Sequence, residues 1–495
     1  MKFDRSSGIL LHPSSFPGRF GIGDLGPGAF IFLDFLKAAG CSLWQILPLG
    51  PTGFGDSPYQ SFSAFAGNPY LISPKLLLQE GFLHSDDLVE KTHFSQFRIE
   101  FGMIIPWKLN IIEKAYINFS DKHTLHDEFN KFCFEEQQWL EDYALFMALK
   151  EIYGGCPWTN FPDLLRNHDP LTMLDSRKKL KQSIDRYKFY QFLFFRQWRL
   201  LKAYAKKLGI KIIGDIPLYV AHDSADVWAN PELFQLDSKC QPKVVAGVPP
   251  DYFSPTGQLW GNPIYQWSEH KKSGFRWWIE RIRHILNSVD IIRMDHFRGF
   301  VNYWQVPAGN STAQLGQWVQ GPGIEFFQKL SKSLELSLNF PLIAEDLGII
   351  TEDVVELRDR LDLPGMKILQ FAFTGSDNHF LPHHYLQNCV VYTGTHDNDT
   401  TVGWFNSAPE DEKMFAKEYM GVNGSDIAWD LIKLGWASVA GYAIAPMQDI
   451  LKLDSSARMN FPGRIGGNWE WRMPENYNEN GLIERLNKIN ETYGR

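Results

Sequence analysis

The sequence predicts an α/β fold, a (β/α)₈ TIM barrel with inserted, largely helical subdomains. Three observations predict it: short apolar runs recur along the chain, helical stretches separate most of them, and polar residues follow their ends. Strands that alternate with helices pair in parallel, and eight such strands close into a barrel. We expect the strands within SLWQILPLG from Ser42, NPYLISP from Asn68, IKIIGDIP from Ile210, VDIIRMDH from Val289, FPLIAEDLG from Phe340, MKILQFAF from Met366, CVVYTGTHDN from Cys389 and GYAIAPMQD from Gly441.

Helical stretches precede several of these runs. The segments FIFLDFLKAAG and FRQWRLLKAYAKKLG each end in a glycine, Gly40 and Gly209, which is typical of a helix C-terminus. Two further helical stretches, FRWWIERIRHILNS and GIEFFQKLSKSLELS, precede the fourth and fifth predicted strands. Strand-length apolar runs that alternate with helical stretches indicate parallel pairing of the strands.

The spacing of the runs is uneven, and this predicts where the barrel is interrupted. We expect one catalytic domain over residues 1–495, with a helical insertion roughly at 74–200 between strands two and three. A second segment, roughly 223–270, is dense in Pro, Gly and aromatic residues, and we expect an irregular loop region there. Long ordered loops of this kind more often form rims or lids of a site than filler.

Composition excludes several classes of function. The formal net charge is −8 and no basic block is interleaved with aromatics, so nucleic acid is not an expected partner. No apolar run approaches 18 residues and the first residues lack a secretory apolar core, so we expect neither a membrane span nor export. The five cysteines are scattered without a CxxC pair, which is typical of a reducing compartment. We expect a cytoplasmic protein, with the plastid stroma as the alternative.

Aromatic residues make up 15% of the chain, with 17 Trp, 18 Tyr and 37 Phe. Most aromatic side chains contribute to a core, because they bury large areas. A sugar-binding cleft is the second interpretation, since a pyranose ring presents a face of C–H groups that packs on an aromatic face. Composition leaves both interpretations open.

Acidic and other polar residues follow the predicted strands. Barrel enzymes carry their reacting groups at the carboxyl ends of the strands. A single acidic residue there is a cap or an ion-pair partner as often as it is a functional group. Several acidic residues with Arg and His beside them indicate a polar cleft. These strand-end residues are Asp215, then Arg293, Asp295 and His296, then Glu345 and Asp346, then His396, Asp397 and Asn398, and finally Gln448 and Asp449.

Two chemistries suit such a cluster. Metal-assisted hydrolysis is one, because Asp, Glu and His are common ligands, although the neighbouring Arg would repel a cation. Glycosyl transfer through two carboxylates is the other, with one carboxylate as nucleophile and one as acid and then base. A third carboxylate would bind sugar hydroxyls. The residues alone leave both chemistries open.

Nearly the whole chain resembles the 4-α-glucanotransferase family, also called amylomaltase or disproportionating enzyme, which is glycoside hydrolase family 77 of the α-amylase clan. Its short form, without a large N-terminal extension, matches this length. The resemblance lies in long, ordered strings: SGILLHPSSFPGRFGIGDLG, WQILPLGPTGFGDSPYQSFSAFAGNPYLI, GDIPLYV, GVPPDYFSPTGQLWGNPIY, RMDHFRGF, AEDLG, LPGMKILQFAF, GTHDNDT and GNWEWR.

The resemblance implies that Asp295 is the nucleophile, Glu345 the acid/base and Asp397 the third carboxylate. Arg293 lies two residues before Asp295, on the same side of the strand, and we expect it to lower the pKa of that carboxyl. Glu345 must hold a proton until the glycosidic bond breaks, so we expect its pKa to be raised.

The resemblance also implies a set of sugar-binding residues. We expect the two strand-end histidines to donate to sugar hydroxyls, or alternatively only to order the carboxylates beside them. Tyr59 and Trp260 are expected stacking surfaces, and the loop Gly247–Gly257 is expected to close over the acceptor side. The full expected set is Arg293, His296, His396, Asn398, Tyr59, Ser57, Asp215, Asp251, Phe253, Trp260 and Asn468.

One departure from the family pattern follows the string LQFAF. Relatives often carry an acidic residue there, whereas this chain has Thr374 followed by Gly375. A donor-side hydroxyl contact is therefore lost or moved in this chain.

The implied reaction is a retaining double displacement that passes part of an α-1,4-glucan to the 4-hydroxyl of glucose or another glucan. It requires no metal and no cofactor. The expected partners are malto-oligosaccharides and glucans derived from starch or glycogen, for a monomer or weak homo-oligomer. An α-glucan hydrolase on the same barrel, a non-catalytic glucan-binding protein and a metal hydrolase are the alternatives.

Overall fold

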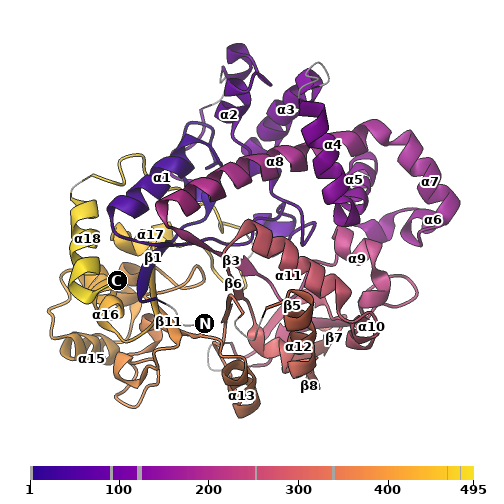
Figure 1. The fold of residues 1–495 in the computed structure, drawn as a ribbon. Helices are drawn as coiled ribbons and strands as arrows, with labels where there is room; N and C mark the ends of the chain where they lie inside the picture. Colours follow the sequence, from indigo (N-terminus) through magenta and orange to yellow (C-terminus); the bar gives the residue numbers. More distant parts are fainter. Residues whose placement is uncertain are drawn as a thin grey trace.

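Eight parallel strands form the centre of the molecule (Figure 1). The computed structural model describes residues 4–89, 93–119, 125–250, 254–336, 340–464, 466–479 and 481–495. In this sheet the strands lie in the order β10-β11-β12-β1-β2-β3-β6-β9. Their bounds are β1 Ser6–Leu10, β2 Leu43–Gln45, β3 Lys211–Ile216, β6 Ile291–Met294, β9 Leu342–Ala344, β10 Gly365–Ile368, β11 Cys389–Tyr392 and β12 Tyr442–Pro446.

The seam between β9 and β10 closes the ring. The backbone N–H of Ala344 donates to the carbonyl of Pro364 at 2.9 Å, and the N–H of Met366 donates to the carboxylate of Asp346 at 2.7 Å. These bonds join the two edge strands, so the sheet forms a nearly closed barrel, and the predicted fold class is confirmed.

The first two strands differ from the prediction. Ser6–Leu10 is β1 and pairs with both β12 and β2, whereas NPYLISP forms a 3₁₀ turn over Pro69–Leu71. The Asn68 side chain accepts from the Tyr70 N–H at 2.9 Å, which stabilises that turn. The backbone of Ser73 bonds to the Gln197 amide, with its N–H at 2.7 Å from Oε1, so it makes no ladder bond there.

Helices surround the strands, as Figure 1 shows. Gly209 ends the longest helix with a left-handed φ of 78°, and Gly40 follows the first with φ 72°, as expected for helix C-termini. The helices outside residues 74–200 are α1 Pro27–Ala38, α9 Ala225–Ala229, α10 Trp267–Lys272, α11 Arg276–Ser288, α12 Gly323–Ser333, α13 Glu352–Arg360, α14 Thr401–Ser407, α15 Glu410–Met420, α16 Ile427–Ala437, α17 Met447–Ile450 and α18 Leu482–Tyr493.

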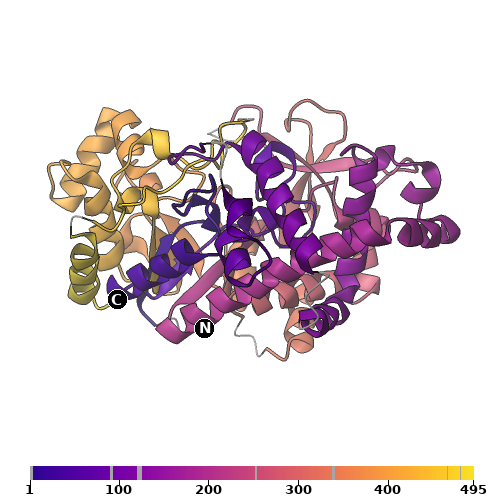
Figure 2. The same ribbon diagram turned by 90° about the horizontal axis from the view of Figure 1, so that it is seen from above.

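The chain between β2 and β3 is largely helical. Figures 1 and 2 show α4 to α7 gathered on one side of the barrel, away from the C-terminal helices α15, α16 and α18. The last helix of this stretch, α8, returns along the barrel to β3. These helices are α2 Pro74–Gln79, α3 Phe101–Phe119, α4 His126–Glu135, α5 Gln137–Ile152, α6 Asp163–Arg166, α7 Pro170–Lys179 and α8 Lys181–Leu208.

A second, antiparallel sheet lies beyond β3, in the order β5-β4-β7-β8. Two of its strands fall within 223–270, where we expected irregular structure. Gly247 of β4 pairs with Leu259 of β5 on one side and with Trp304 of β7 on the other. The pairing of β4 with β7 is non-local and leaves a weak local signal, which explains why irregular structure was expected there. The strands are β4 Val244–Val248, β5 Gln258–Pro263, β7 Asn302–Pro307 and β8 Gln317–Gln320.

Among the helices of the described ranges, none combines the length and the apolar character needed to cross a bilayer.

Candidate active site

Strand register brings the predicted carboxylates together. Asp215 of β3 lies opposite Arg293 of β6, and Met294 of β6 lies opposite Ala344 of β9. The residues after this second pair, Asp295 and Glu345, therefore leave two adjacent strands at the same level. Parallel strands end at one face of a barrel, so these side chains share a rim.

Arg293 connects two of the carboxylates. Its Nη1 lies 2.6 Å from Asp215 Oδ2 and 2.9 Å from Asp295 Oδ1. The Asp215 side chain is fully buried, whereas the Asp295 side chain remains 30% exposed. The hydroxyl of Tyr59 also donates to Asp215 Oδ2, at 2.8 Å. One cation therefore serves two anions, and the more exposed anion is the one able to meet a substrate.

Glu345 has a different environment, because its close partners are backbone groups. The N–H of His296 donates to Oε2 at 2.7 Å and that of Leu347 donates to Oε1 at 2.8 Å. His296 has a left-handed backbone with φ 51°, which a non-glycine residue adopts at some cost. This conformation aims its N–H at the carboxylate.

Burial raises the pKa of both Asp295 and Glu345. The expected lowering at Asp295 is therefore wrong in its net direction: Arg293 does lower that pKa, but burial and the neighbouring carboxylates outweigh it. The pKa of Glu345 is raised, which is the expected direction, and burial is the main cause. The difference between the two groups lies in their partners, a guanidinium for Asp295 and neutral N–H groups for Glu345.

The third carboxylate, Asp397, follows β11 and is 48% exposed. Its Oδ1 lies 3.4 Å from His396 Nε2 and accepts from the Asn460 side-chain amide at 2.6 Å. The ring of His396 stacks on Tyr59, with centroids 5.1 Å apart and planes 18° apart. Tyr59 therefore contacts both the Asp215–Arg293 pair and the His396–Asp397 pair.

Burial favours the neutral form of both strand-end histidines. Burial lowers the pKa of His296 to about 3 and also lowers the pKa of His396. The ring of His296 meets Trp260 edge to face at 4.8 Å, and its buried Nε2 has no hydrogen-bond partner in the described part of the chain. This free nitrogen suits a sugar hydroxyl, whereas His396 also orders the carboxylate beside it.

Three predicted binding residues make local backbone contacts. Ser57 Oγ accepts from the Tyr59 N–H at 3.2 Å, and Asn398 Oδ1 accepts from the Thr395 N–H at 2.8 Å. Asn468 Oδ1 accepts from the Phe461 N–H at 2.9 Å. In the structure these side chains shape the loops around the site. Asp251 and Phe253, also predicted, lie outside the described residues.

Sequence reasoning missed three residues at this rim. Arg458 and Asn460 both bind Asp397, and Trp469 lies 5.7 Å from the Tyr59 ring and 5.9 Å from the His396 ring. Trp469 is buried and has φ 65°, the left-handed region. Trp469 lies in the string GNWEWR, so the family resemblance of that string was the sequence signal that could have identified it.

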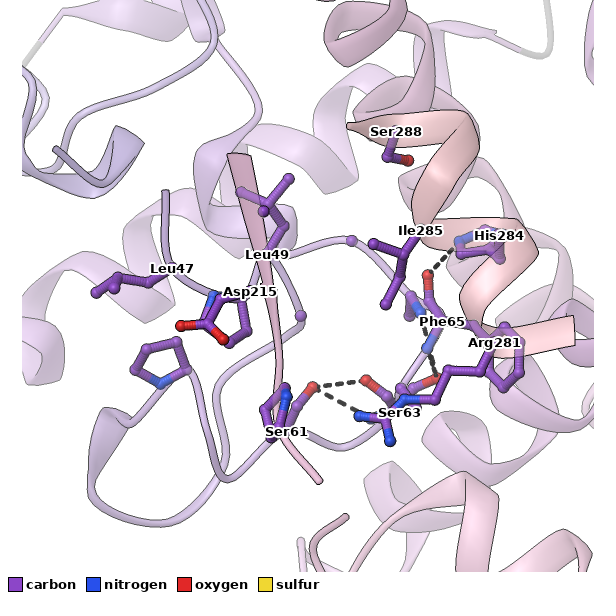
Figure 3. A pocket seen from close by; sticks show the side chains of 18 of the residues that line it. Leu47, Leu49, Ser61, Ser63, Phe65, Asp215, Arg281, His284, Ile285 and Ser288 are labelled. Carbon is purple, nitrogen blue, oxygen red and sulfur yellow. Dashed lines mark hydrogen bonds between the residues drawn. The ribbon is translucent and has the colours of Figure 1, made fainter. Parts of the chain in front are cut away.

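A cavity of about 90 Å³ adjoins the site, and Asp215 and Tyr59 are among the residues that line it. Figure 3 shows Asp215 at this cavity. The loop that follows Tyr59 forms one wall, where Ser61 Oγ donates to the Ser63 carbonyl at 2.8 Å. Helix α11 forms another, where the His284 ring contacts the Phe65 carbonyl at 2.8 Å. Asp295, Glu345 and Asp397 do not line this cavity. The cavity therefore lies beside these carboxylates, among residues that support the site.

The fold and rim define a class of protein: a (β/α)₈ carbohydrate-active enzyme with carboxylates at the ends of its fourth, fifth and seventh barrel strands. Residues 11–478 match the family described as 4-alpha-glucanotransferase. The chain therefore belongs to the 4-alpha-glucanotransferase family and is a glycosyltransferase-type enzyme.

Curated relatives and a solved structure agree with this assignment. The 4-alpha-glucanotransferase of Synechocystis sp. is 51% identical over 99% of this chain and 98% of its own length. That of Thermus thermophilus is 50% identical over 96% and 95%, respectively. An amylomaltase from Streptococcus agalactiae in complex with acarbose superimposes with a TM-score of 0.96 at 40% identity, covering 99% of this chain and all of that one.

Proposed function

We propose that this 4-α-glucanotransferase moves α-1,4-glucan segments by a double displacement in which Asp295 is the nucleophile and Glu345 the acid/base. The observation that carries the proposal is the asymmetric pairing of two neighbouring carboxyls: Arg293 pairs Asp295, whereas in the described part of the chain Glu345 is hydrogen-bonded only by backbone N–H groups. A guanidinium favours an anion more strongly than neutral donors do. The proton that the first step of the reaction needs therefore resides on Glu345.

In the first step, Asp295 Oδ2 attacks the anomeric carbon, because Arg293 occupies Oδ1. The bond from that carbon to the glycosidic oxygen breaks, and the leaving oxygen takes the proton of Glu345. The products are a β-glucosyl ester on Asp295, a Glu345 carboxylate and a released glucan with a free 4-hydroxyl.

In the second step, the 4-hydroxyl of an acceptor glucan attacks the same carbon. Its proton passes to Glu345, the ester bond breaks, and its electron pair returns to Asp295. Two inversions give net retention. Transfer requires that the acceptor outcompete water, which depends on positioning the acceptor sugar and excluding solvent.

The remaining rim residues have binding roles in this proposal. Asp397 accepts hydrogen bonds from ring hydroxyls, the free Nε2 of His296 meets a sugar hydroxyl, and Trp260 supplies an apolar face beside it. The solved relative binds acarbose, and we extend this to malto-oligosaccharides and to starch- or glycogen-derived glucans as ligands of this chain. We also propose the cytoplasm as its compartment, on the scattered cysteines, and a monomer or weak homo-oligomer as its state.

Incubation of the pure protein with maltotriose in the presence of a chelator tests the function. We expect free glucose and longer maltodextrins while total reducing ends stay constant, because transfer conserves glycosidic bonds. Rising reducing ends would identify water as the acceptor and support the hydrolase alternative. Loss of activity on chelation would support the metal alternative, and an unchanged substrate would support a binding protein.

A further inference from the structure

One loop contacts the third carboxylate through both its backbone and its side chain. Residues 458–464 and 466–469, called here the 458–469 loop, follow β12 along the chain. Arg458 Nη2 donates to the backbone carbonyl of Asp397 at 2.7 Å, and Asn460 Nδ2 donates to Asp397 Oδ1 at 2.6 Å. The loop therefore fixes both the position of Asp397 and the rotation of its carboxylate.

Asn460 makes the shortest contact to this carboxylate among the described residues. The other close group is His396 Nε2 at 3.4 Å, on a ring whose pKa is lowered by burial. The Asp397 side chain is 48% exposed, so packing constrains it little. Without the amide of Asn460, rotation about the side-chain bonds of Asp397 would have little to oppose it.

The 458–469 loop is itself held at several points. The Arg458 and Arg464 guanidinium groups lie 4.5 and 5.1 Å from the Phe461 ring. Asn468 bonds the Phe461 N–H at 2.9 Å and the Arg464 carbonyl at 2.8 Å. At the end of the loop, Trp469 packs near the rings of Tyr59 and His396. Asn460 is thus presented from a fixed backbone.

We propose that Asn460 is a positioning residue for the reaction, which acts by orienting the carboxylate of Asp397; this rests on the proposed role of Asp397 in binding ring hydroxyls. The amide occupies Oδ1 and leaves Oδ2 free to accept from the sugar. A neutral donor also leaves the negative charge of Asp397 available to the positively charged transition state, which a Lys or Arg at this point would offset.

A double-mutant cycle tests this proposal. An α-glucosyl fluoride donor is suitable, because fluoride release is measurable at low activity. We expect Asn460→Ala to lower kcat by tenfold to a hundredfold with less than a threefold change in KM, because orientation matters most in the transition state. In the Asp397→Ala background, the same change should alter kcat less than twofold. An equal loss in both backgrounds would overturn the positioning role.

Asn460→Asp gives a second test that does not depend on lost activity alone. It places a carboxyl 2.6 Å from Asp397 Oδ1, where two anions repel. When the pair holds one proton, the new acid O–H replaces the amide N–H as donor. Activity of the variant should therefore be low at neutral pH and recover as pH falls, with its optimum shifted to the acid side of the wild type. An unshifted profile would contradict the proposal.

Asn476→Asp is the matched control. Asn476 Nδ2 also contacts a carboxylate, Glu479 Oε2 at 3.2 Å, but on the exposed surface. Its pH profile and kcat should equal those of the wild type. Asp397→Ala alone separates the two proposals: wild-type activity of that variant would refute the role of Asp397 itself. A strongly reduced but measurable Asp397→Ala, in which Asn460→Ala lowers kcat by the same further factor as in the wild type, would refute only the role of Asn460. Thermal unfolding of each variant shows whether it has folded.

Discussion

At the scale of single residues, the chemistry depends on how one buried cation is shared. Arg293 binds the fully buried Asp215 at 2.6 Å and the partly exposed Asp295 at 2.9 Å. Asp215 therefore fixes the guanidinium, and the guanidinium in turn holds Asp295, the proposed nucleophile. Burial raises the pKa of both Asp295 and Glu345, so burial alone does not distinguish nucleophile from acid. Their partners do.

Azide rescue distinguishes the two roles. Both Asp295→Ala and Glu345→Ala should lose several orders of magnitude in kcat on maltotriose. With an α-glucosyl fluoride donor and azide, Glu345→Ala should form α-glucosyl azide, because azide opens the β-linked ester. Asp295→Ala should form β-glucosyl azide by direct displacement. Nuclear magnetic resonance of the products gives the anomer, and the same anomer from both variants would refute the assignment.

The raised pKa values also predict a pH-dependent stability. In the unfolded chain these carboxyls ionise at about pH 4, whereas burial delays their ionisation in the fold. The unfolded state therefore binds fewer protons above that pH, and folding loses stability as pH rises toward the folded pKa. Asp295→Asn removes the contribution of Asp295 to this loss of stability, while Asp215 still pairs Arg293. We expect its Tm to exceed that of the wild type at pH 7 and the difference to shrink at pH 4.5; a constant difference would contradict this.

The proximity of Asp295 and Glu345, the proposed reacting carboxylates, could be predicted from strand ends, but the contacts of several loop residues could not. Asp295 and Glu345 directly follow apolar strands, so parallel pairing alone brings them together. Ser57 and Asn468 carry groups that bind either sugars or backbone, and in the structure they bind backbone. Asn460 lies far in sequence from Asp397, and its contact depends on the path of the 458–469 loop.

At the scale of elements, apolar runs locate strands only where their backbone groups remain free to pair. NPYLISP has the composition of a strand, yet two prolines and the Asn68 side chain favour a 3₁₀ turn. Ser6–Leu10 begins with two serines and pairs on both sides. Ser7 is accommodated because its hydroxyl donates to Asn490 Oδ1 at 2.6 Å. The polar residues made β1 hard to predict from the sequence, and the Ser7 hydroxyl finds its hydrogen-bond partner in a distant helix, α18.

Asp449 supports the segment between β11 and α14, which carries His396 and Asp397. Its buried carboxylate accepts from Thr393 Oγ1 at 2.5 Å, from the Thr401 N–H at 2.6 Å and from Thr401 Oγ1 at 2.8 Å. Asp449→Ala leaves these donors unsatisfied and should lower the free energy of unfolding by about 3 kcal/mol.

We also expect kcat of Asp449→Ala to fall, because the segment that carries Asp397 loses its anchor. Thermal unfolding and glucose release from maltotriose measure the two effects. Asp454→Ala is the control, since that exposed carboxylate caps only a 3₁₀ turn through the Ser456 N–H at 2.9 Å. Equal effects of the two variants would refute the anchoring role.

At the scale of the whole molecule, the segments between strands build the walls of the site. Helices α4 to α7, between β2 and β3, lie on one side of the barrel, and the antiparallel sheet comes from the segments that flank α10, α11 and β6 (Figure 1). Helical periodicity is local, so the helical character of 74–200 could be read along the chain. The pairing of β4 with β7 joins residues about 60 positions apart and has no local signal.

Lys150 links the helices between β2 and β3 to the loop after β3. Its Nζ lies 2.6 Å from Asp223 Oδ2 and 2.9 Å from the Cys156 carbonyl, and the side chain is only 6% exposed. The same Nζ lies 5.1 Å from the ring of Phe62, in the loop that carries Tyr59. Loss of this cation would therefore affect both the attachment of α5 and the stacking of Tyr59 on His396.

Lys150→Met should lower the free energy of unfolding by about 3 kcal/mol, because it leaves Asp223 without its buried partner. Lys131→Met is the control: that lysine is 73% exposed, lies 3.8 Å from Glu135 and should change stability by less than about 0.5 kcal/mol. If the pair also holds the loop of Tyr59, Lys150→Met raises KM for maltotriose more than it lowers kcat, since ground-state binding is lost with the stacking. A stability loss with unchanged kinetics would confine the pair to attachment of the helices, whereas an effect no larger than that of Lys131→Met would refute both roles.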